Sequence, residues 1–185
     1  MLRTPSDIAD ELLVLHSQGG DRGALAVLIK RWNPRLWRHA RRLTDGSDSA
    51  DDATQEAWIA IIRRIRTLDD PSRFGAWAYR IVTNKCADRT RRLVRERKHH
   101  ESLNHQAPVS DTKVDETEVG RLRSAMRRLE SERRALLGLF YVDGLNVAQI
   151  AGVLGVPKGT VKSRLFSARE ELKRVLERTS DADDR

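Results

Sequence analysis

Two helical patterns separated by a tight turn, between Asn146 and Leu176, place the strongest constraint on the fold. A short helix is predicted over residues 147–154, with Asn146 as its N-terminal cap. Gly155 can take up a left-handed backbone conformation, and Pro157 suits the start of a helix, where its missing N–H group does no harm. A longer helix follows over residues 158–177. Together these elements form a helix-turn-helix, an arrangement typical of proteins that bind DNA.

The second helix of such a motif enters the major groove of duplex DNA. Lys162 and Ser163 can donate hydrogen bonds to base edges or phosphates, and Phe166 can lie against a thymine methyl group. The predicted DNA-binding set on this helix is Lys158, Thr160, Lys162, Ser163, Arg164, Phe166, Ser167 and Arg169. The alternative is a helical hairpin that contacts other proteins, with its Lys and Arg side chains merely solvated.

The rest of the chain also favours helices, and no alternating strand pattern of convincing length occurs. Further helices are predicted over residues 7–17, 22–44, 48–66, 72–96, 119–129 and 131–142. Pro34 should kink or divide the second of these helices. The fold class is therefore all-α.

The segment 97–118 contains Pro108 and few large apolar residues, as a flexible linker does. We expect it to join two small helical domains, at residues 1–96 and 119–178, with a short tail at 179–185. His99, His100 and His105 lie in this polar stretch, where we expect solvated side chains and no metal site.

The formal net charge of +8 favours a nucleic acid or an anionic surface as partner, although a generic solvated surface could carry it too. Residues 1–95 hold 18 Lys and Arg against 12 Asp and Glu, residues 96–118 hold 3 against 6, and residues 119–185 hold 14 against 9. The lone Cys86 excludes an internal disulfide and a site of several thiolates. Neither a signal peptide nor an apolar run of about 18 residues is present, so we expect a cytoplasmic protein without membrane insertion.

The helix predicted over residues 48–66 has two different faces at about 100° per residue. One face is a core stripe, made of Ala50, Thr54, Ala57, Trp58, Ile61 and Ile65. The opposite face contains Asp52, Gln55, Glu56, Ile59 and Arg63. Ile59 is an apolar residue on this polar face. A single exposed Ile is commonplace, but it can also mark the centre of a protein interface.

The helix predicted over residues 72–96 has a basic side with one aromatic residue and one amide. Its members are Arg73, Trp77, Arg80, Asn84, Ala87, Arg91 and Arg95. This mixture suits single-stranded or partly melted DNA, because bases stack on rings while cations follow the phosphates. The alternative is that Trp77 belongs to the core and the arginines are ordinary surface residues.

Three motifs in order resemble the extracytoplasmic-function (ECF, group 4) RNA polymerase sigma factors of the sigma-70 family. DDATQEAWIAIIRRI resembles the acidic-Asp-x-x-Gln-Glu helix of family region 2, and FGAWAYRIVTNKCADRTRR resembles the Phe-x-x-Trp-x-Tyr-Arg-Ile-x-x-Asn helix of the same region. GLNVAQIAGVLGVPKGTVKSRLFSAREEL resembles the helix-turn-helix of region 4. The resemblance covers about residues 8–96 and 119–177.

The resemblance implies a sigma factor, not an enzyme, that needs no cofactor and no small-molecule substrate. It would bind core RNA polymerase through the β′ coiled coil and the β subunit, recognise the −35 and −10 promoter elements and promote transcription initiation. A separate anti-sigma factor would control it by masking both domains.

The same resemblance implies roles for the residues. The face of Asp52, Gln55, Glu56, Ile59 and Arg63 would bind polymerase. The region 4 helix would recognise the −35 element as duplex. The melted −10 element would lie on Asp70, Ser72, Arg73, Trp77, Arg80, Asn84 and Arg91.

Two other functions remain open at this point. An ordinary helix-turn-helix regulator would share the C-terminal motif but would not bind core polymerase. A nuclease would need clustered carboxylates or histidines, and the neighbouring pairs Asp51-Asp52 and Asp69-Asp70 do not complete such a site.

Overall fold

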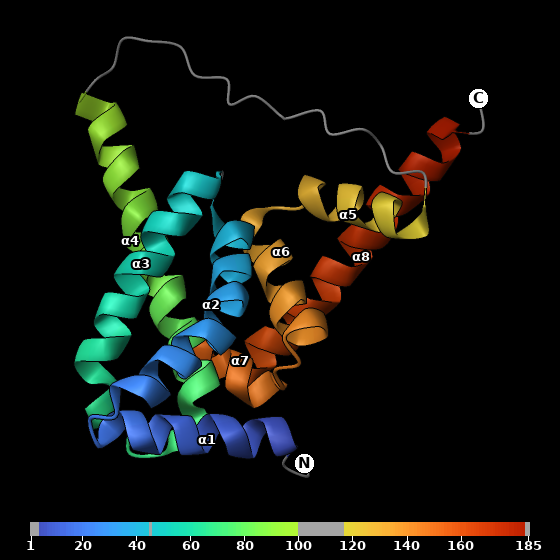
Figure 1. Ribbon diagram of the computed structural model, residues 1–185. Coiled ribbons are helices and arrows are strands. Elements are labelled where there is room, and N and C mark those ends of the chain that lie inside the picture. Colours follow the sequence, from blue (N-terminus) through green and yellow to red (C-terminus); the bar gives the residue numbers. More distant parts are fainter. Residues whose placement is uncertain (1–3, 45, 100–116, 184–185) are drawn as a thin grey trace.

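The computed structural model describes residues 4–44, 46–99 and 117–183, and within these ranges the chain contains helices and no strand (Figure 1). The all-α fold class is thus confirmed. The α-helices are α1 (Pro5–Gln18), α2 (Arg22–Leu43), α3 (Ser47–Arg64), α4 (Phe74–His99), α5 (Glu118–Arg128), α6 (Ser131–Leu137), α7 (Val147–Leu154) and α8 (Lys158–Asp183). Short 3-10 turns cover Ile65–Thr67 and Pro71–Arg73, and a π-helical turn covers Gly138–Val142.

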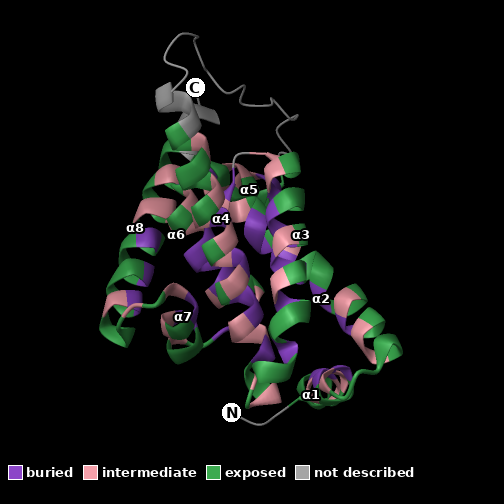
Figure 2. Cartoon of the chain, turned by 90° about the vertical axis from the view of Figure 1, so that its left-hand side faces the viewer, coloured by how far each residue is buried: buried purple, intermediate pink, exposed green. Residues whose placement is uncertain are grey.

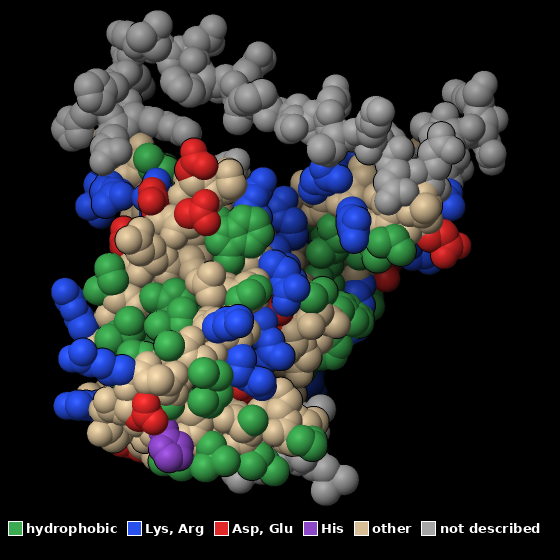
Figure 3. All heavy atoms as spheres, viewed as in Figure 1, with side chains coloured by type: hydrophobic (Ala, Val, Ile, Leu, Met, Phe, Trp, Pro, Cys, Tyr) green, Lys and Arg blue, Asp and Glu red, His purple; other side chains and the backbone are tan. Residues whose placement is uncertain are grey.

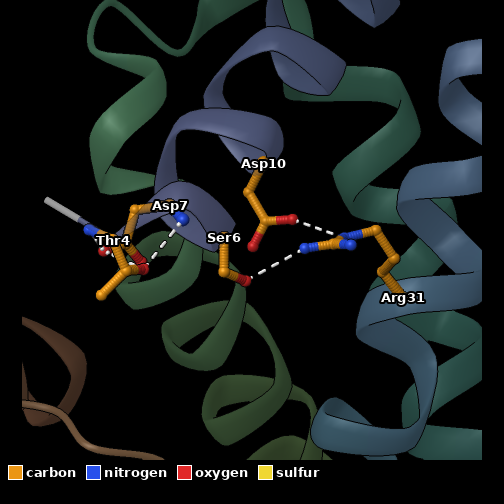
Figure 4. Close-up of polar contacts among 5 residues, drawn as sticks. All are labelled: Thr4, Ser6, Asp7, Asp10 and Arg31. Atoms are coloured by element: carbon orange, nitrogen blue, oxygen red, sulfur yellow. Dashed lines mark hydrogen bonds and ion pairs between the residues drawn. The ribbon is translucent and has the colours of Figure 1, made fainter.

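Helices α1 to α4 form the N-terminal half, in which α1 lies across the lower end of the bundle (Figure 1). Arg31 of α2 holds α1 in place, because its guanidinium pairs with Asp10 at 2.8 Å and donates to Ser6 at 3.1 Å (Figure 4). At the other end of α1, the Gln18 amide donates to the carbonyl oxygens of Ile65 and Leu68 at 2.8 and 2.7 Å.

An aromatic cluster fills the centre of this half. The Trp32 ring meets Phe74 and Tyr79 edge-on, with centroids 5.3 and 6.0 Å apart. Position 75 is a glycine, and the indole ring of Trp32 leaves no room there for a side chain. A Cβ atom at this position would lie 2.6 Å from Trp32. Packing at this density makes the core intolerant of added volume.

Pro34 does not divide α2, which runs as one helix from Arg22 to Leu43. Pro34 and Lys30, whose carbonyl loses its helical partner, are both exposed, so water can satisfy that carbonyl. The buried Trp32 and Leu36 on the opposite side keep the helix against the core.

Helices α5 to α8 form the C-terminal half, and the helix-turn-helix lies where it was predicted. Asn146 caps α7 through a reciprocal pair of hydrogen bonds with Gln149, each 2.9 Å long. Gly155 ends α7 with a left-handed backbone at φ 68°. Val161, Leu165 and Ala168 of α8 are buried against the rest of this half.

Two helix ends differ from the sequence-based expectation. Helix α4 continues to His99 instead of ending at residue 96, and α8 continues to Asp183, into the predicted tail. The α4 extension contains the good helix formers Arg97 and Lys98, which lower the cost of an extra turn. The α8 extension is helical although it contains weaker helix formers such as Thr179, Ser180 and Asp181. The rest of the predicted linker, with His100 and His105, lies outside the described residues, so its flexibility remains a prediction.

The two halves pack directly against each other, with α4 beside α7 and α2 beside α6. Their buried apolar residues form one continuous cluster that includes Tyr79 and Val82 from one half and Leu139 and Ile150 from the other. Figure 2 shows the buried residues gathered in the middle of the molecule, along α4 and the helices beside it.

His39 is a fully buried histidine in this interior. Its Nε2 atom lies 2.9 Å from the Thr83 hydroxyl, which itself donates to the carbonyl of Tyr79. Nε2 therefore carries the proton, and Nδ1 has no hydrogen-bond partner. Burial, aided by the charge of Arg42, lowers the pKa of His39 from 6.5 to about 3.

His39 should therefore make stability depend on pH. Its folded-state pKa is depressed, so only the unfolded chain takes up a proton as the pH falls from 6.5 toward 3, and stability is lost over that window. Between pH 6.5 and 5.5 this loss is about 1 kcal/mol. Chemical unfolding at the two pH values should show it in the wild type and in His16→Gln, an exposed control, but not in His39→Gln. An equal loss in His39→Gln would refute the assignment.

Candidate nucleic-acid interface

The first turns of α8 present a basic, exposed surface. Lys158, Lys162, Ser163, Arg164 and Ser167 are exposed. Phe166 projects outward with 63% of its surface exposed, which is unusual for so large an apolar side chain. Between residues 158 and 169 the chain holds no acidic residue, so nothing on this helix opposes an approaching phosphate.

Two members of the predicted α8 set differ from the others. Thr160 is half-buried, and its carbonyl accepts a hydrogen bond from the Ser163 hydroxyl at 3.0 Å. The Arg169 guanidinium lies 5.5 Å from the ring centroids of both Phe140 and Tyr141. Arg169 thus has aromatic partners within the protein. Lys158 and Lys162, by contrast, are simply exposed to solvent.

The basic side of α4 faces solvent as predicted from its spacing. Arg80, Asn84 and Arg91 are exposed, and Trp77 is half-buried with its ring 6.1 Å from that of Phe74. Trp77 therefore belongs partly to the core and partly to the surface, and its contact with DNA remains a prediction. Arg91 also pairs with Asp88 on the next turn of the helix, at 3.1 Å.

Asp70, Ser72 and Arg73 come together in the turn before α4. The Asp70 carboxylate accepts from the Ser72 backbone N–H at 3.0 Å and from the Ser72 hydroxyl at 2.5 Å. It also pairs with Arg73 at 3.2 Å. Asp70 thus caps the turn that begins at Pro71, a structural task in addition to any contact with DNA.

The outer face of α3 combines exposed apolar and charged groups. Asp52, Gln55 and Arg63 are exposed, Glu56 is half-buried, and Ile59 is 45% exposed. The opposite stripe, including Ala57, Trp58 and Ile61, is buried as predicted.

Sequence reasoning missed two features of the α3 face. Ile62, one helical turn after Ile59, is 43% exposed and enlarges the apolar centre. Its spacing of three residues from Ile59 was a signal that could have found it. Cations of α4 also reach the face: Arg89 pairs with Asp52 at 2.7 Å and Lys85 with Glu56 at 3.3 Å.

Sequence reasoning also missed a groove of about 1230 Å³ between α2 and helices α5, α6 and α8. Its apolar lining includes Trp37, Val119, Leu122, Met126, Tyr141 and Leu172. Cationic residues surround this lining: Arg38, Arg41, Arg42, Arg123, Arg127, Arg134, Arg169 and Lys173. Figure 3 shows Lys and Arg side chains gathered over the boundary between α2 and the C-terminal half. The two walls lie far apart in sequence, so no local pattern could reveal the groove.

Within the described part of the chain, no helix is both long and apolar enough to cross a membrane, and no cluster of His, Cys, Asp and Glu could hold a metal ion.

Comparisons with known proteins agree with this geometry. Residues 28–96 match the family model of Sigma-70 region 2, and residues 120–172 match that of Sigma-70, region 4. The chain is 36% identical over 168 residues to ECF RNA polymerase sigma factor SigM of Mycobacterium tuberculosis, covering 90% of this chain and 83% of the relative. It is 29% identical over 170 residues to ECF RNA polymerase sigma factor SigW of Bacillus subtilis, covering 85% and 91%.

Solved structures give the same result for the fold. The chain resembles CnrH, solved in complex with the cytosolic domain of CnrY, with 27% identity, a TM-score of 0.65 and coverage of 91% of this chain and 97% of that one. The sigma factor RpoE of Bartonella quintana, solved with the anti-sigma factor NepR, is 21% identical with a TM-score of 0.69, covering 83% and 96%. At that identity the second likeness concerns the fold alone.

Proposed function

Since this chain belongs to the extracytoplasmic-function sigma factors of the sigma-70 family, we propose that its different exposed helix faces carry out different steps of transcription initiation. As a sigma factor it binds core RNA polymerase, recognises promoter elements and promotes initiation. The observation that carries the proposal is that the matched regions 2 and 4 expose different surfaces, a mixed apolar face on α3, a basic side on α4 and a basic end on α8. We place the protein in the bacterial cytoplasm, where it acts by binding and not as an enzyme.

The face of α3 binds the β′ coiled coil of polymerase. Ile59 and Ile62 provide an apolar centre, and Asp52, Gln55 and Arg63 form a polar rim, the composition of a protein interface. The Asp52–Arg89 pair is partly exposed, so its net stabilisation is small and Asp52 can exchange Arg89 for a cation of the partner.

The side of α4 and the turn before it bind the melted −10 element. Extruding a base from the stack costs a few kcal/mol. A base that stacks on the exposed part of Trp77, while Arg80 and Arg91 meet the phosphates, recovers a similar amount. These contacts let binding energy drive strand opening without ATP.

The exposed end of α8 recognises the −35 element as duplex. Lys162 and Ser163 point outward from the N-terminal part of the helix, which enters the major groove in this motif. Phe166 offers an apolar contact for a thymine methyl group. Lys158 and Arg164 neutralise phosphates.

An anti-sigma factor controls the protein through the groove between α2 and the C-terminal half. The groove combines apolar lining with an excess of cations, so it fits an acidic amphipathic helix. CnrH and the Bartonella quintana RpoE were each solved with a second protein bound, which agrees with control by such a partner.

The first experiment measures binding of the labelled chain to purified bacterial core polymerase. Asp52→Arg combined with Gln55→Ala should weaken binding at least tenfold, or about 1.4 kcal/mol, because the β′ contact meets a reversed charge. Arg64→Glu, which reverses an exposed charge on the same helix but outside the face, should bind as the wild type does. No binding of the wild type, with duplex DNA binding intact, would instead favour an ordinary helix-turn-helix regulator.

The −35 assignment is tested with the holoenzyme on promoter variants. Lys162→Ala should cost about 1–3 kcal/mol and relax the preference at one position, because a base contact is lost. Arg164→Ala should weaken all sequences alike and lower the salt dependence, because a phosphate contact is lost. Unchanged sequence preference in Lys162→Ala would show that the recognition face is wrongly assigned.

The groove assignment is tested with displayed helical peptides selected for binding to the wild-type chain. The selected peptides should be acidic and amphipathic, and Leu122→Glu should abolish their binding, because it adds a like charge to an apolar wall. Lys158→Glu, outside the groove, serves as the matched control. Selected peptides that bind Leu122→Glu normally would contradict the assignment.

A further inference from the structure

A small cleft between α2 and α3 differs in charge from the rest of this basic molecule. Its volume is about 330 Å³, and its lining includes Ile29, Asn33, Trp37, Asp51, Gln55 and Trp58. Within the described part of the chain no Lys or Arg lines it, although the chain carries a formal net charge of +8. A cleft of this volume lies at the lower limit for small-molecule sites, so it suits one side chain better than a larger ligand.

Two crossed hydrogen bonds fix the polar groups of the cleft. Trp37 of α2 donates through Nε1 to the carboxylate of Asp51 in α3 at 2.7 Å. In the opposite direction, Trp58 of α3 donates through Nε1 to the side-chain oxygen of Asn33 in α2 at 2.9 Å. Each indole N–H is therefore used within the protein and holds its acceptor in place. Groups that are ordered in advance lose little conformational freedom when a partner binds.

Asp51 is the charged group of this lining. One of its oxygens accepts from Trp37, and the other retains lone pairs for a further donor. The neighbouring Asp52 pairs with Arg89 of α4 at 2.7 Å, whereas among the described residues no Lys or Arg pairs with Asp51. The cleft thus offers a negative charge that the chain itself leaves unneutralised.

These groups together fit an arginine side chain. The faces of aromatic rings such as Trp37 attract cations, and a guanidinium stacks on them while its N–H fork meets a carboxylate such as Asp51. The side-chain oxygen of Gln55 can accept another of the five guanidinium N–H groups. An apolar side chain would desolvate Asp51 without giving it a partner. A nucleic acid would bring its phosphates toward a carboxylate, which opposes binding.

We propose that this cleft takes an arginine side chain of core RNA polymerase. The inference rests on the proposed function, because Gln55 belongs both to the cleft and to the face of α3 assigned to polymerase. It extends that interface from α3 onto α2, where Asn33 and Trp37 form the second wall of the cleft. Polymerase thereby contacts both helices, and the crossed tryptophans determine which side chain it must present.

The test measures the affinity of the labelled chain for purified bacterial core polymerase. The label is attached through Glu170→Cys, an exposed position of α8 outside the cleft. The native Cys86 stays unlabelled, because it is buried and burial raises the pKa of its thiol to about 11. Circular dichroism confirms that each variant keeps its helices.

Variants of Asp51 test the charge. Asp51→Asn keeps an oxygen that accepts from Trp37 and removes the charge, so affinity should fall at least tenfold at low salt. The difference from the wild type should narrow in about 1 M salt, where the Debye length is only about 3 Å. Asp51→Lys should bind more weakly still, because a like charge meets the arginine. Asp69→Asn removes an exposed carboxylate outside the cleft and should bind as the wild type does.

A matched pair of variants at Trp37 tests the aromatic wall. Trp37→Phe and Trp37→Leu both remove the indole N–H, but only phenylalanine keeps a ring on which a guanidinium can stack. Trp37→Phe should therefore bind polymerase at least threefold more tightly than Trp37→Leu. Equal affinities of these two variants would overturn the assignment of an arginine to the cleft.

Failure of this inference can be told apart from failure of the proposed function. Wild-type affinity in both Asp51→Asn and Asp51→Lys, together with weak binding of the Asp52→Arg and Gln55→Ala double variant, would overturn the cleft proposal alone. In that case the face of α3 would bind polymerase without the cleft. Absence of binding by the wild type would overturn both.

Discussion

Helix α4 is buried from two sides, and the arrangement of the other helices depends on this constraint. Phe74, Ala78, Tyr79, Val82 and Cys86 recur along it at helical spacing, and none exceeds 2% exposure. Helices α2 and α3 cover part of this face, and α7 covers another part. Because one side of the helix must meet all these neighbours, its remaining side faces solvent. That exposed side carries the arginines proposed to bind the melted strand.

Local features of the fold were predictable from sequence, because their causes lie within a few residues. The capping box of Asn146 with Gln149 and the left-handed Gly155 both act inside one short segment. The buried stripe of α3 likewise follows from helical periodicity alone. The family resemblance was also visible, since it rests on three contiguous motifs. The roles of individual site residues remain proposals, because exposure permits binding without identifying what is bound.

Features that bring distant segments together were not predictable in the same way. Arg42 and Asp143 form a buried ion pair but are separated by 101 positions, and neither stands out from the many charged residues of the chain. The groove has the same origin, with one wall from α2 and the other from α5 and α8. That Pro34 leaves α2 undivided has a related reason: burial of Trp32 and Leu36 outweighs one missing hydrogen bond, and burial depends on the whole fold.

The environment of Cys86 also determines how this sigma factor responds to oxidants. A thiol with a pKa of about 11 is almost entirely protonated at neutral pH, whereas peroxide and electrophiles react with the thiolate. Its burial on the core side of α4 further limits their access. Because it is the chain's single cysteine, oxidative stress should leave the folded protein without a modified thiol. A redox signal carried by thiol chemistry would therefore have to reach this sigma factor through another molecule.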